Sequence, residues 1–457
     1  MIAQPPARGV PSVRLVLATL TLAALLALAI FGIEGSWMPA DLVRLHHFWA
    51  KDYWKLAKEN VLLYWNSGEP LTGLVELTVF NLCGLHAIGF HALALAVFAA
   101  DLFLLFRLAI LLGCSSLHAG FAVFLMTIHA GLWRMYFRVS GLEHALALLF
   151  FSGALVHYIR IRSAGRRLSA RDTAILIALY VAAFNSSPVA LSLPLVLWLY
   201  EWVYGRPGWP EVRPMVWASA FALIFLAGQG VRPGMFWEWW LSGNVETTAE
   251  LAYCSPNSFS FRAMCLAWAI LFYIAFRRRR PELRFAFGLF PISMLPYALT
   301  PDRFLNNTHI PAYGVALVLA SVVAGAVEFI GREPPFRRWP AGLAEAAATV
   351  AVAAILTFYA HGFSAGPRPD PLYGDRDIAF ALGELRRLDP RIPPRSSVAF
   401  LNDPTWAHSM IRLAPLWFRD RRLRLAFPAP GSALQGADAV FEFQGGKLVQ
   451  LRPAPGR

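Results

Sequence analysis

The chain has 457 residues, of which 57% are hydrophobic and only 15% are charged, and its mean hydropathy is +0.50. These values lie outside the range of ordinary globular domains and indicate a membrane protein. The net charge of +13 does not indicate a nucleic-acid partner, because the arginines are scattered over many short loops and not gathered on one face. The four cysteines form no Cys-x-x-Cys or Cys/His pattern, which argues against a zinc site or a disulfide framework.

Long apolar stretches fill the chain from Val13 to about Ala360. The first of them, Leu15–Ile33, has 19 residues without a charge, enough for a helix to cross a bilayer core of ~30 Å. It is too long for the apolar core of a signal peptide and lacks a convincing cleavage site, so we expect a retained first span. We therefore predict an all-α polytopic membrane domain over residues 1–360, with about eleven transmembrane helices.

The placement of the arginines predicts the orientation of these helices. Alternate loops carry the positive charge, and such loops face the cytoplasm. They contain Arg8, Arg14, Arg107, Arg160, Arg162, Arg166, Arg167, Arg171, Arg206, Arg213, Arg277 to Arg280, Arg284, Arg332, Arg337 and Arg338. The opposite loops, 34–85, 133–143, 185–188, 232–261 and 301–309, are richer in Trp, Tyr, His and acids. We expect a multi-pass protein of the bacterial inner membrane, with the N-terminus in the cytoplasm and everything after about His361 outside it.

The first external loop and the C-terminal tail have patterns of their own. Residues 41–65 place apolar side chains at helical spacing and charged ones elsewhere, which predicts one amphipathic helix at the membrane interface. In the tail, helical spacing over 377–388 and 404–418, a short strand at 397–401 and a hairpin over 439–451 predict a small α/β domain. We place this extracytoplasmic domain at residues 361–457.

Three stretches in the first 200 residues carry a family resemblance. They are Cys83–His91 (preceded by Pro70), His129 through Ser140-Gly141, and the Leu-rich segment Ala190–Tyr200. They resemble the GT-C superfamily of membrane glycosyltransferases, and within it bacterial relatives of the transmembrane O-mannosyltransferases that carry tetratricopeptide repeats. The resemblance implies a GT-C-like fold and transfer of a sugar from a polyprenyl-phosphate carrier on the outer face of the membrane.

Several charged positions of the family pattern are changed in this chain. Ala40 stands where the first acid of a pair is expected, and Ser186-Ser187-Pro188 replaces a Ser-Lys-Glu motif. Glu69 stands at the place of an expected arginine, and Arg134 at the place of an acid. Either the substrate contacts have been rebuilt or the transferase reaction has been lost.

The resemblance implies that the catalytic acid comes from the first external loop. Asp41 matches this position, and Glu34, directly after the first span, is the alternative. The carboxylate would accept the proton of the acceptor hydroxyl or hold a divalent metal, Mg²⁺ or Mn²⁺. Asp41 has a plainer interpretation as the acid that the dipole favours at a helix N-terminus.

Candidate groups for the donor phosphate lie further along the chain. Arg134 and Arg138 are four residues apart in an external loop, and two arginines suit a phosphate, although they could also reach lipid headgroups. His91 and His129 lie near span ends and are donor-site candidates, although a lone histidine usually serves packing. Asp101 is a candidate functional acid within a span.

These observations leave three classes of function open. The first is transfer of a sugar from a polyprenyl-phosphate donor to a lipid, glycan or protein acceptor. The second is a catalytically degenerate relative that binds prenyl-linked glycans or scaffolds envelope assembly. The third, a transporter or flippase, is disfavoured because the spans show no inverted repeat.

Overall fold

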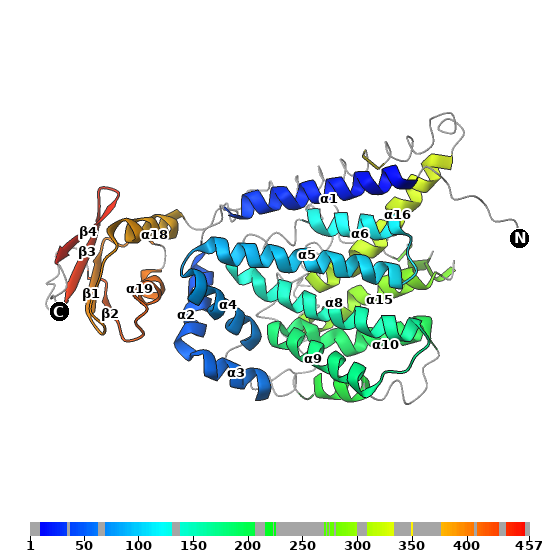
Figure 1. The fold of residues 1–457 in the computed structure, drawn as a ribbon, viewed down its shortest axis with the longest axis horizontal. Coiled ribbons are helices and arrows are strands. Elements are labelled where there is room, and N and C mark those ends of the chain that lie inside the picture. Colours follow the sequence, from blue (N-terminus) through cyan, green and yellow to red (C-terminus); the bar gives the residue numbers. More distant parts are fainter. Residues whose placement is uncertain are drawn as a thin grey trace, which may run out of the picture. The chain divides into compact units, whose positions relative to one another are not determined.

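The computed structural model describes residues 10–33, 37–62, 69–129, 138–205, 280–298, 309–332, 376–405, 409–428 and 436–452, with short pieces in 215–224, 269–277 and 349–350. The chain divides into two compact units. Unit 1 comprises Met1–Leu28, Ala96–Arg134 and His144–Pro367, and unit 2 comprises Ala29–Leu95, Met135–Glu143 and Arg368–Arg457. Figure 1 shows the elements with their labels.

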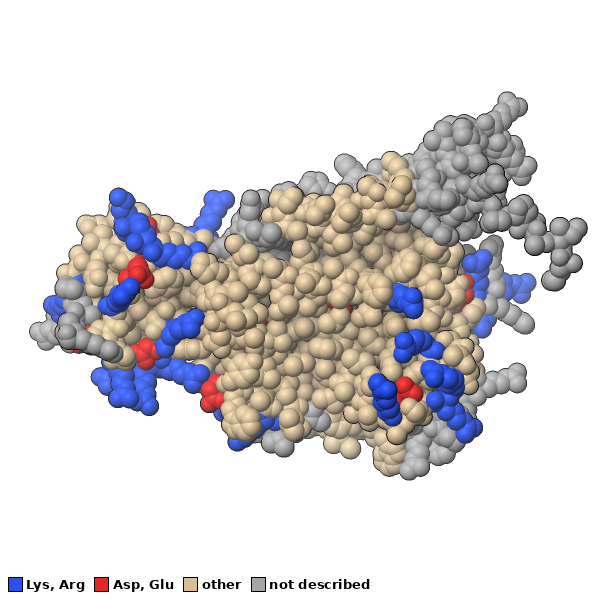
Figure 2. All heavy atoms as spheres, in the orientation of Figure 1, with Lys and Arg blue, Asp and Glu red and all other residues tan. Residues whose placement is uncertain are grey.

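Unit 1 consists of packed apolar helices. Its elements are parts of α1 (Val10–Ile33), α5 (Ala87–Leu111) and α8 (Leu142–Ser163), with α6 (Ser116–Ile128), α9 (Ala170–Ser186), η3 (Pro188–Ser192), α10 (Leu193–Tyr204), α15 (Pro281–Ala298) and α16 (His309–Arg332). Helices α15 and α16 approach closely at Gly314, where an added Cβ would lie 2.8 Å from the Ala286 carbonyl oxygen. On the face shown in Figure 2, the body of this unit is tan, and Lys and Arg gather near the connection from α8 to α9.

Two helices of the described chain, Ala87–Leu111 and Val139–Ser163, are long and apolar enough to cross a membrane. Five shorter apolar helices accompany them: Leu15–Ile30, Pro70–Cys83, Ser116–Ile128, Pro188–Tyr204 and His309–Gly325. The mostly helical architecture agrees with the predicted fold class. The number of about eleven spans stays a prediction.

Unit 2 combines three short helices from residues 39–83 with a small mixed sheet. The helices are α2 (Pro39–Lys51), α3 (Tyr53–Leu62) and α4 (Pro70–Cys83), followed by the turn η2 (Val139–Gly141). The C-terminal elements are α18 (Arg376–Leu388), β1 (Ser397–Leu401), α19 (Met410–Phe418), β2 (Arg424–Ala426), β3 (Ala439–Gln444) and β4 (Lys447–Arg452). The sheet order is β2-β1-β3-β4, with β1 parallel to both neighbours and β3 antiparallel to β4.

One hydrophobic core joins both parts of unit 2. Trp37, Leu42 and Phe80 from the first loop belong to the same cluster of buried side chains as Phe400 and Leu416 from the tail. The described tail therefore folds together with residues 37–90. The predicted domain boundary between residues 360 and 361 therefore divides two segments, residues 37–90 and the described tail, that share one hydrophobic core.

The prediction of a single helix over residues 41–65 is wrong. The chain forms α2 and α3, which are separated at Asp52, where φ is 70°. The Asp52 carboxylate accepts a hydrogen bond from the backbone N–H of Lys55 and so starts the second helix. Residues 63–65 of the predicted helix lie outside the described residues.

Candidate functional site

Asp41 lies in the first turn of α2, shortly after the first apolar helix. Pro39 occupies the first helical position, where its missing N–H costs nothing. The Asp41 side chain is 1% exposed, and its Oδ2 accepts a hydrogen bond from the Met38 backbone N–H at 3.1 Å. Its Oδ1 accepts another from the backbone N–H of Ser140 at 2.9 Å. Asp41 therefore ties the first loop to the segment that precedes α8.

Arg44, one turn further along α2, is surrounded by carboxylates. Its Nε lies 3.0 Å from Glu76 Oε1 on α4, and its Nη2 lies 3.5 Å from Glu69 Oε2. It also forms an ion pair with Glu143, at the start of α8. The guanidinium carbon lies 5.3 Å from the centre of the Phe48 ring. We call Asp41, Arg44, Glu69, Glu76 and Glu143 the acidic cluster.

The acidic cluster holds four carboxyl groups and one guanidinium, which forms ion pairs with three of them, so not every carboxyl group is neutralised. Glu76 is fully buried and is the only charged residue of α4. Burial raises the pKa of Glu76 to about 7, with Asp41 and Glu69 adding to the rise and Arg44 opposing it. A carboxyl group that titrates near neutral pH is suited to accept and release a proton.

Arg138 begins the short η2 segment that reaches Asp41. Its backbone carbonyl accepts a hydrogen bond from Gly141 N–H at 3.0 Å, and its side chain is half-buried. Within the described part of the chain, the buried Nε has no hydrogen-bond partner. A buried guanidinium nitrogen without an acceptor suits an anionic ligand, because an unmade hydrogen bond there is costly.

The other predicted site residues are Glu34, Arg134, His91 and His129. Glu34 and Arg134 lie outside the described residues, so the predicted pairing of Arg134 with Arg138 stays a prediction. His91 is buried near the start of α5. His129 follows α6 and belongs to unit 1, whereas Asp41 belongs to unit 2.

The sequence analysis missed three members of the acidic cluster. Arg44, Glu76 and Glu143 match no motif, and the separation of 99 residues between Arg44 and Glu143 hides their pairing. Glu69 was noted only as a departure from the family pattern. The one available signal was Glu76, an acid within the apolar run 71–85.

The divalent metal stays a prediction, and the described residues offer no preformed site for it. No three His, Cys, Asp or Glu side chains among them are arranged to hold a metal ion. Both Asp41 oxygens already accept backbone N–H groups.

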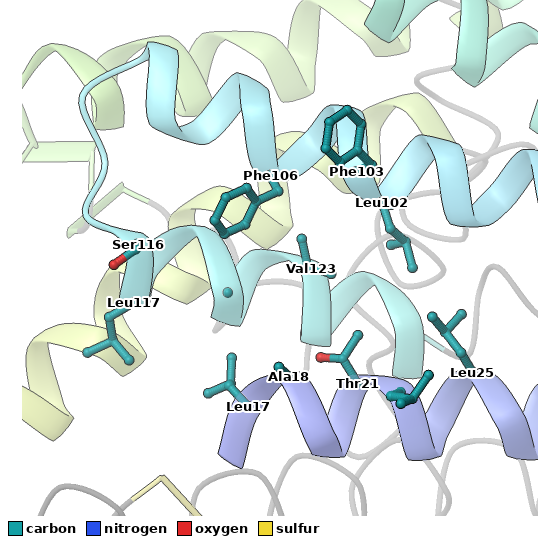
Figure 3. Close-up of a pocket in the computed structure, with 12 residues that line it drawn as sticks. Leu17, Ala18, Thr21, Leu25, Leu102, Phe103, Phe106, Ser116, Leu117 and Val123 are labelled. Atoms are coloured by element: carbon teal, nitrogen blue, oxygen red, sulfur yellow. The ribbon is translucent and has the colours of Figure 1, made fainter. Parts of the chain in front are cut away.

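A cavity of about 460 Å³ lies in unit 1, between α1, α5 and α6 (Figure 3). Its lining is apolar apart from Thr21 and Ser116, so it offers little for catalysis.

Asp101, on α5, is fully buried, and neither carboxylate oxygen has a hydrogen-bond partner in the described chain. Its backbone carbonyl accepts a hydrogen bond from the Tyr313 hydroxyl at 2.7 Å.

Comparison with known proteins gave matches among solved structures only. No family model and no curated protein matches the chain. Two matches are crystal structures of ArnT from Cupriavidus metallidurans. The structure with bound undecaprenyl phosphate is 15% identical, with 89% of this chain and 85% of that chain covered and a TM-score of 0.47. The apo structure is 14% identical, with 91% and 86% covered and a TM-score of 0.45.

A third match is the Archaeoglobus fulgidus oligosaccharyltransferase tethered to an acceptor peptide that contains the NVT sequon. It is 13% identical, with 90% of this chain and 64% of that chain covered and a TM-score of 0.45. These similar structures are membrane glycosyltransferases of the GT-C superfamily.

Proposed function

We propose that this chain is a GT-C-type glycosyltransferase of the cytoplasmic membrane that moves a sugar from a polyprenyl-phosphate donor to a lipid, glycan or protein acceptor on the outer face. The observation that carries the proposal is the position of Asp41. It follows the first apolar helix, as the family resemblance requires of the catalytic acid, and it is hydrogen-bonded to Ser140 in the second resembling stretch. Two landmarks that are 99 residues apart thus meet at one carboxylate.

The proposed reaction uses the acidic cluster and Arg138. The acceptor hydroxyl oxygen forms a bond to the anomeric carbon, the bond from that carbon to the phosphate oxygen breaks, and the hydroxyl proton passes to the Asp41 carboxylate. The Arg138 guanidinium stabilises the departing polyprenyl phosphate. Glu76, with its pKa near 7, then takes up the released proton. An acceptor reaches Asp41 only when the contact from Ser140 N–H opens, so substrate binding must move the segment 138–141.

The proposal is tested by replacing Asp41 in cells that lack the native gene. In these cells the wild-type gene should restore the addition of a sugar to an envelope lipid, glycan or protein, measured by mass spectrometry as an increase in mass. Asp41→Asn should not restore this increase. Loss of a general base lowers a rate by at least ~10²-fold.

Asp172→Asn is the matched control. Asp172 is the third residue of α9 and its Oδ2 accepts the Ser169 backbone N–H at 3.1 Å, as the Asp41 carboxylate does for Met38. This variant should restore the mass fully. Restoration by Asp41→Asn as well would contradict a catalytic role for Asp41.

A second candidate function is binding of prenyl-linked glycans without catalysis. It is favoured by the same two hydrogen bonds, because both Asp41 oxygens are engaged in holding the backbone. In that case cells that lack the gene have altered envelope assembly, and the wild-type gene and Asp41→Asn restore it equally. Mass spectrometry then finds no envelope molecule whose mass changes by that of a sugar when the gene is absent.

A further inference from the structure

A second cavity lies in unit 2, where α4 ends near the end of α19. Its volume is about 410 Å³. Phe80, Leu82, Leu85 and His86 line it from the end of α4 and the following turn, and Trp417 and Arg419 line it from the end of α19. None of these residues belongs to the acidic cluster.

Four exposed arginines of the tail lie near this cavity or against α2. Arg386 Nη2 donates a hydrogen bond to the Leu85 carbonyl at 3.0 Å. The guanidinium carbons of Arg419 and Arg421 lie 5.4 Å from the Phe80 ring centre and 5.2 Å from the Trp49 ring centre. The fourth, Arg412, together with the larger effect of burial, lowers the pKa of His46 on α2. We call Arg386, Arg412, Arg419 and Arg421 the arginine face.

No described carboxylate neutralises the arginine face. Within the described residues, none of its four guanidiniums lies within 4.0 Å of a carboxylate oxygen. Figure 2 shows Lys and Arg gathered over the C-terminal elements of unit 2. The aromatic and carbonyl contacts use few of the five N–H donors of each guanidinium, so the others can bind an anion.

The chain around the cavity continues directly into a long apolar helix. The turn Gly84–His86 precedes α5, which has 25 residues and a mean hydropathy of 2.3. If α5 spans the bilayer, as we propose, its first residues lie at the depth of the lipid headgroups. Leu82 and Ile88, on either side of the turn, are 80% and 53% exposed. Apolar side chains next to free arginines match a ligand with an anionic head and an apolar tail.

We propose that the arginine face and its cavity bind the phosphate headgroup of a membrane lipid, with Leu82 and Ile88 against the acyl chains. Arg386 and Arg419 contact the phosphate, because they lie at the turn where the apolar helix begins. This lipid site requires that α5 spans the membrane, and it does not depend on sugar transfer.

The test measures lipid affinity of the purified full-length protein in a neutral detergent, with dioctanoyl phosphatidic acid as the probe and thermophoresis as the readout. Arg386→Gln combined with Arg419→Gln should weaken binding at least tenfold. Arg160→Gln combined with Arg171→Gln removes two exposed arginines of unit 1 and should leave the affinity unchanged. Dioctanoylglycerol, which lacks the phosphate, and inorganic phosphate, which lacks the chains, should each bind at least tenfold more weakly than phosphatidic acid.

Equal affinity of wild type and the Arg386/Arg419 double variant would overturn the proposal. Equal binding of dioctanoylglycerol would show an apolar site only, and equal binding of inorganic phosphate would show a site for soluble anions. If the double variant fails to fold, Arg421→Gln, whose guanidinium covers Trp49, must still weaken binding at least threefold for the proposal to stand. Because the readout is binding, its failure is distinct from a failure of the Asp41→Asn test.

Discussion

Glu76 shows how a single buried carboxyl group can set the pH response of this protein. It lies on α4, whose 14 residues are too few to cross a bilayer core of ~30 Å. Burial, with smaller contributions from neighbouring acids, raises its pKa from 4.5 to about 7. Between these pH values the native chain holds a proton that the unfolded chain has released. The stability of the native state therefore falls as the pH rises from about 4.5 to about 7 and stays at the lower level above it.

We expect Glu76→Gln to flatten this response. The difference in unfolding free energy between pH 5 and pH 8 should shrink by about 1–3 kcal/mol, which thermal unfolding followed by tryptophan fluorescence would measure. Glu384→Gln is the control, because hydrogen bonds from Arg387 and the Leu448 backbone lower the pKa of Glu384, so that its titration lies below this pH range. An unchanged response in Glu76→Gln would contradict the assignment.

The sequence analysis singled out Asp41 and Ser140 separately and did not predict their contact. Arg44 could not be identified, because its partners Glu69, Glu76 and Glu143 come from other elements and from as far as 99 residues away. Ion pairs of this kind depend on tertiary packing, which no local pattern records.

Among the elements, the packing of α2 on α4 holds the acidic cluster together. Gly73 on α4 faces Phe48 on α2, and an added Cβ would lie 2.7 Å from Phe48 Cδ1. Phe48 is 1% exposed and has little room to move.

Gly73→Ala should therefore destabilise the protein by about 1–3 kcal/mol, the usual effect of overpacking a core. Gly383→Ala in α18, where an added Cβ meets nothing within 4 Å, should be neutral or stabilising. The midpoint temperatures of thermal unfolding of both variants, compared with that of the wild type, test this prediction. A midpoint for Gly73→Ala at or above that of the wild type would show that α2 and α4 are not in close contact.

Local patterns predicted the elements of the tail well and those of the first loop less well. Strand β1 and the hairpin of β3 and β4 are confirmed, because their side chains alternate and a Gly-Gly turn joins the hairpin. Strand β2 was missed, because Arg424–Ala426 has only three residues and no alternation. The break at Asp52 was missed because a positive φ at an aspartate has no distinct signal in the surrounding apolar spacing.

The proposed function depends on how the whole molecule is oriented in the membrane. In a variant without the native cysteines, Gln444→Cys at the end of β3 and Ser163→Cys at the end of α8 place thiols at exposed positions. An impermeant maleimide should label Gln444→Cys in intact cells and Ser163→Cys only after permeabilisation, because arginine-rich loops face the cytoplasm. Labelling of Ser163→Cys in intact cells would contradict the predicted topology.

The most direct test of the central claim is the release of polyprenyl phosphate by the purified protein. The donors are the polyprenyl-linked sugars extracted from membranes of the producing cell, so the sugar need not be known, and an extract of the same membranes supplies the acceptor. We predict that the wild type and Asp172→Asn release polyprenyl phosphate and that Asp41→Asn releases it at least ~10²-fold more slowly. Release by Asp41→Asn at the rate of the wild type would contradict the proposed site, and no release by any of the three would contradict the transferase itself.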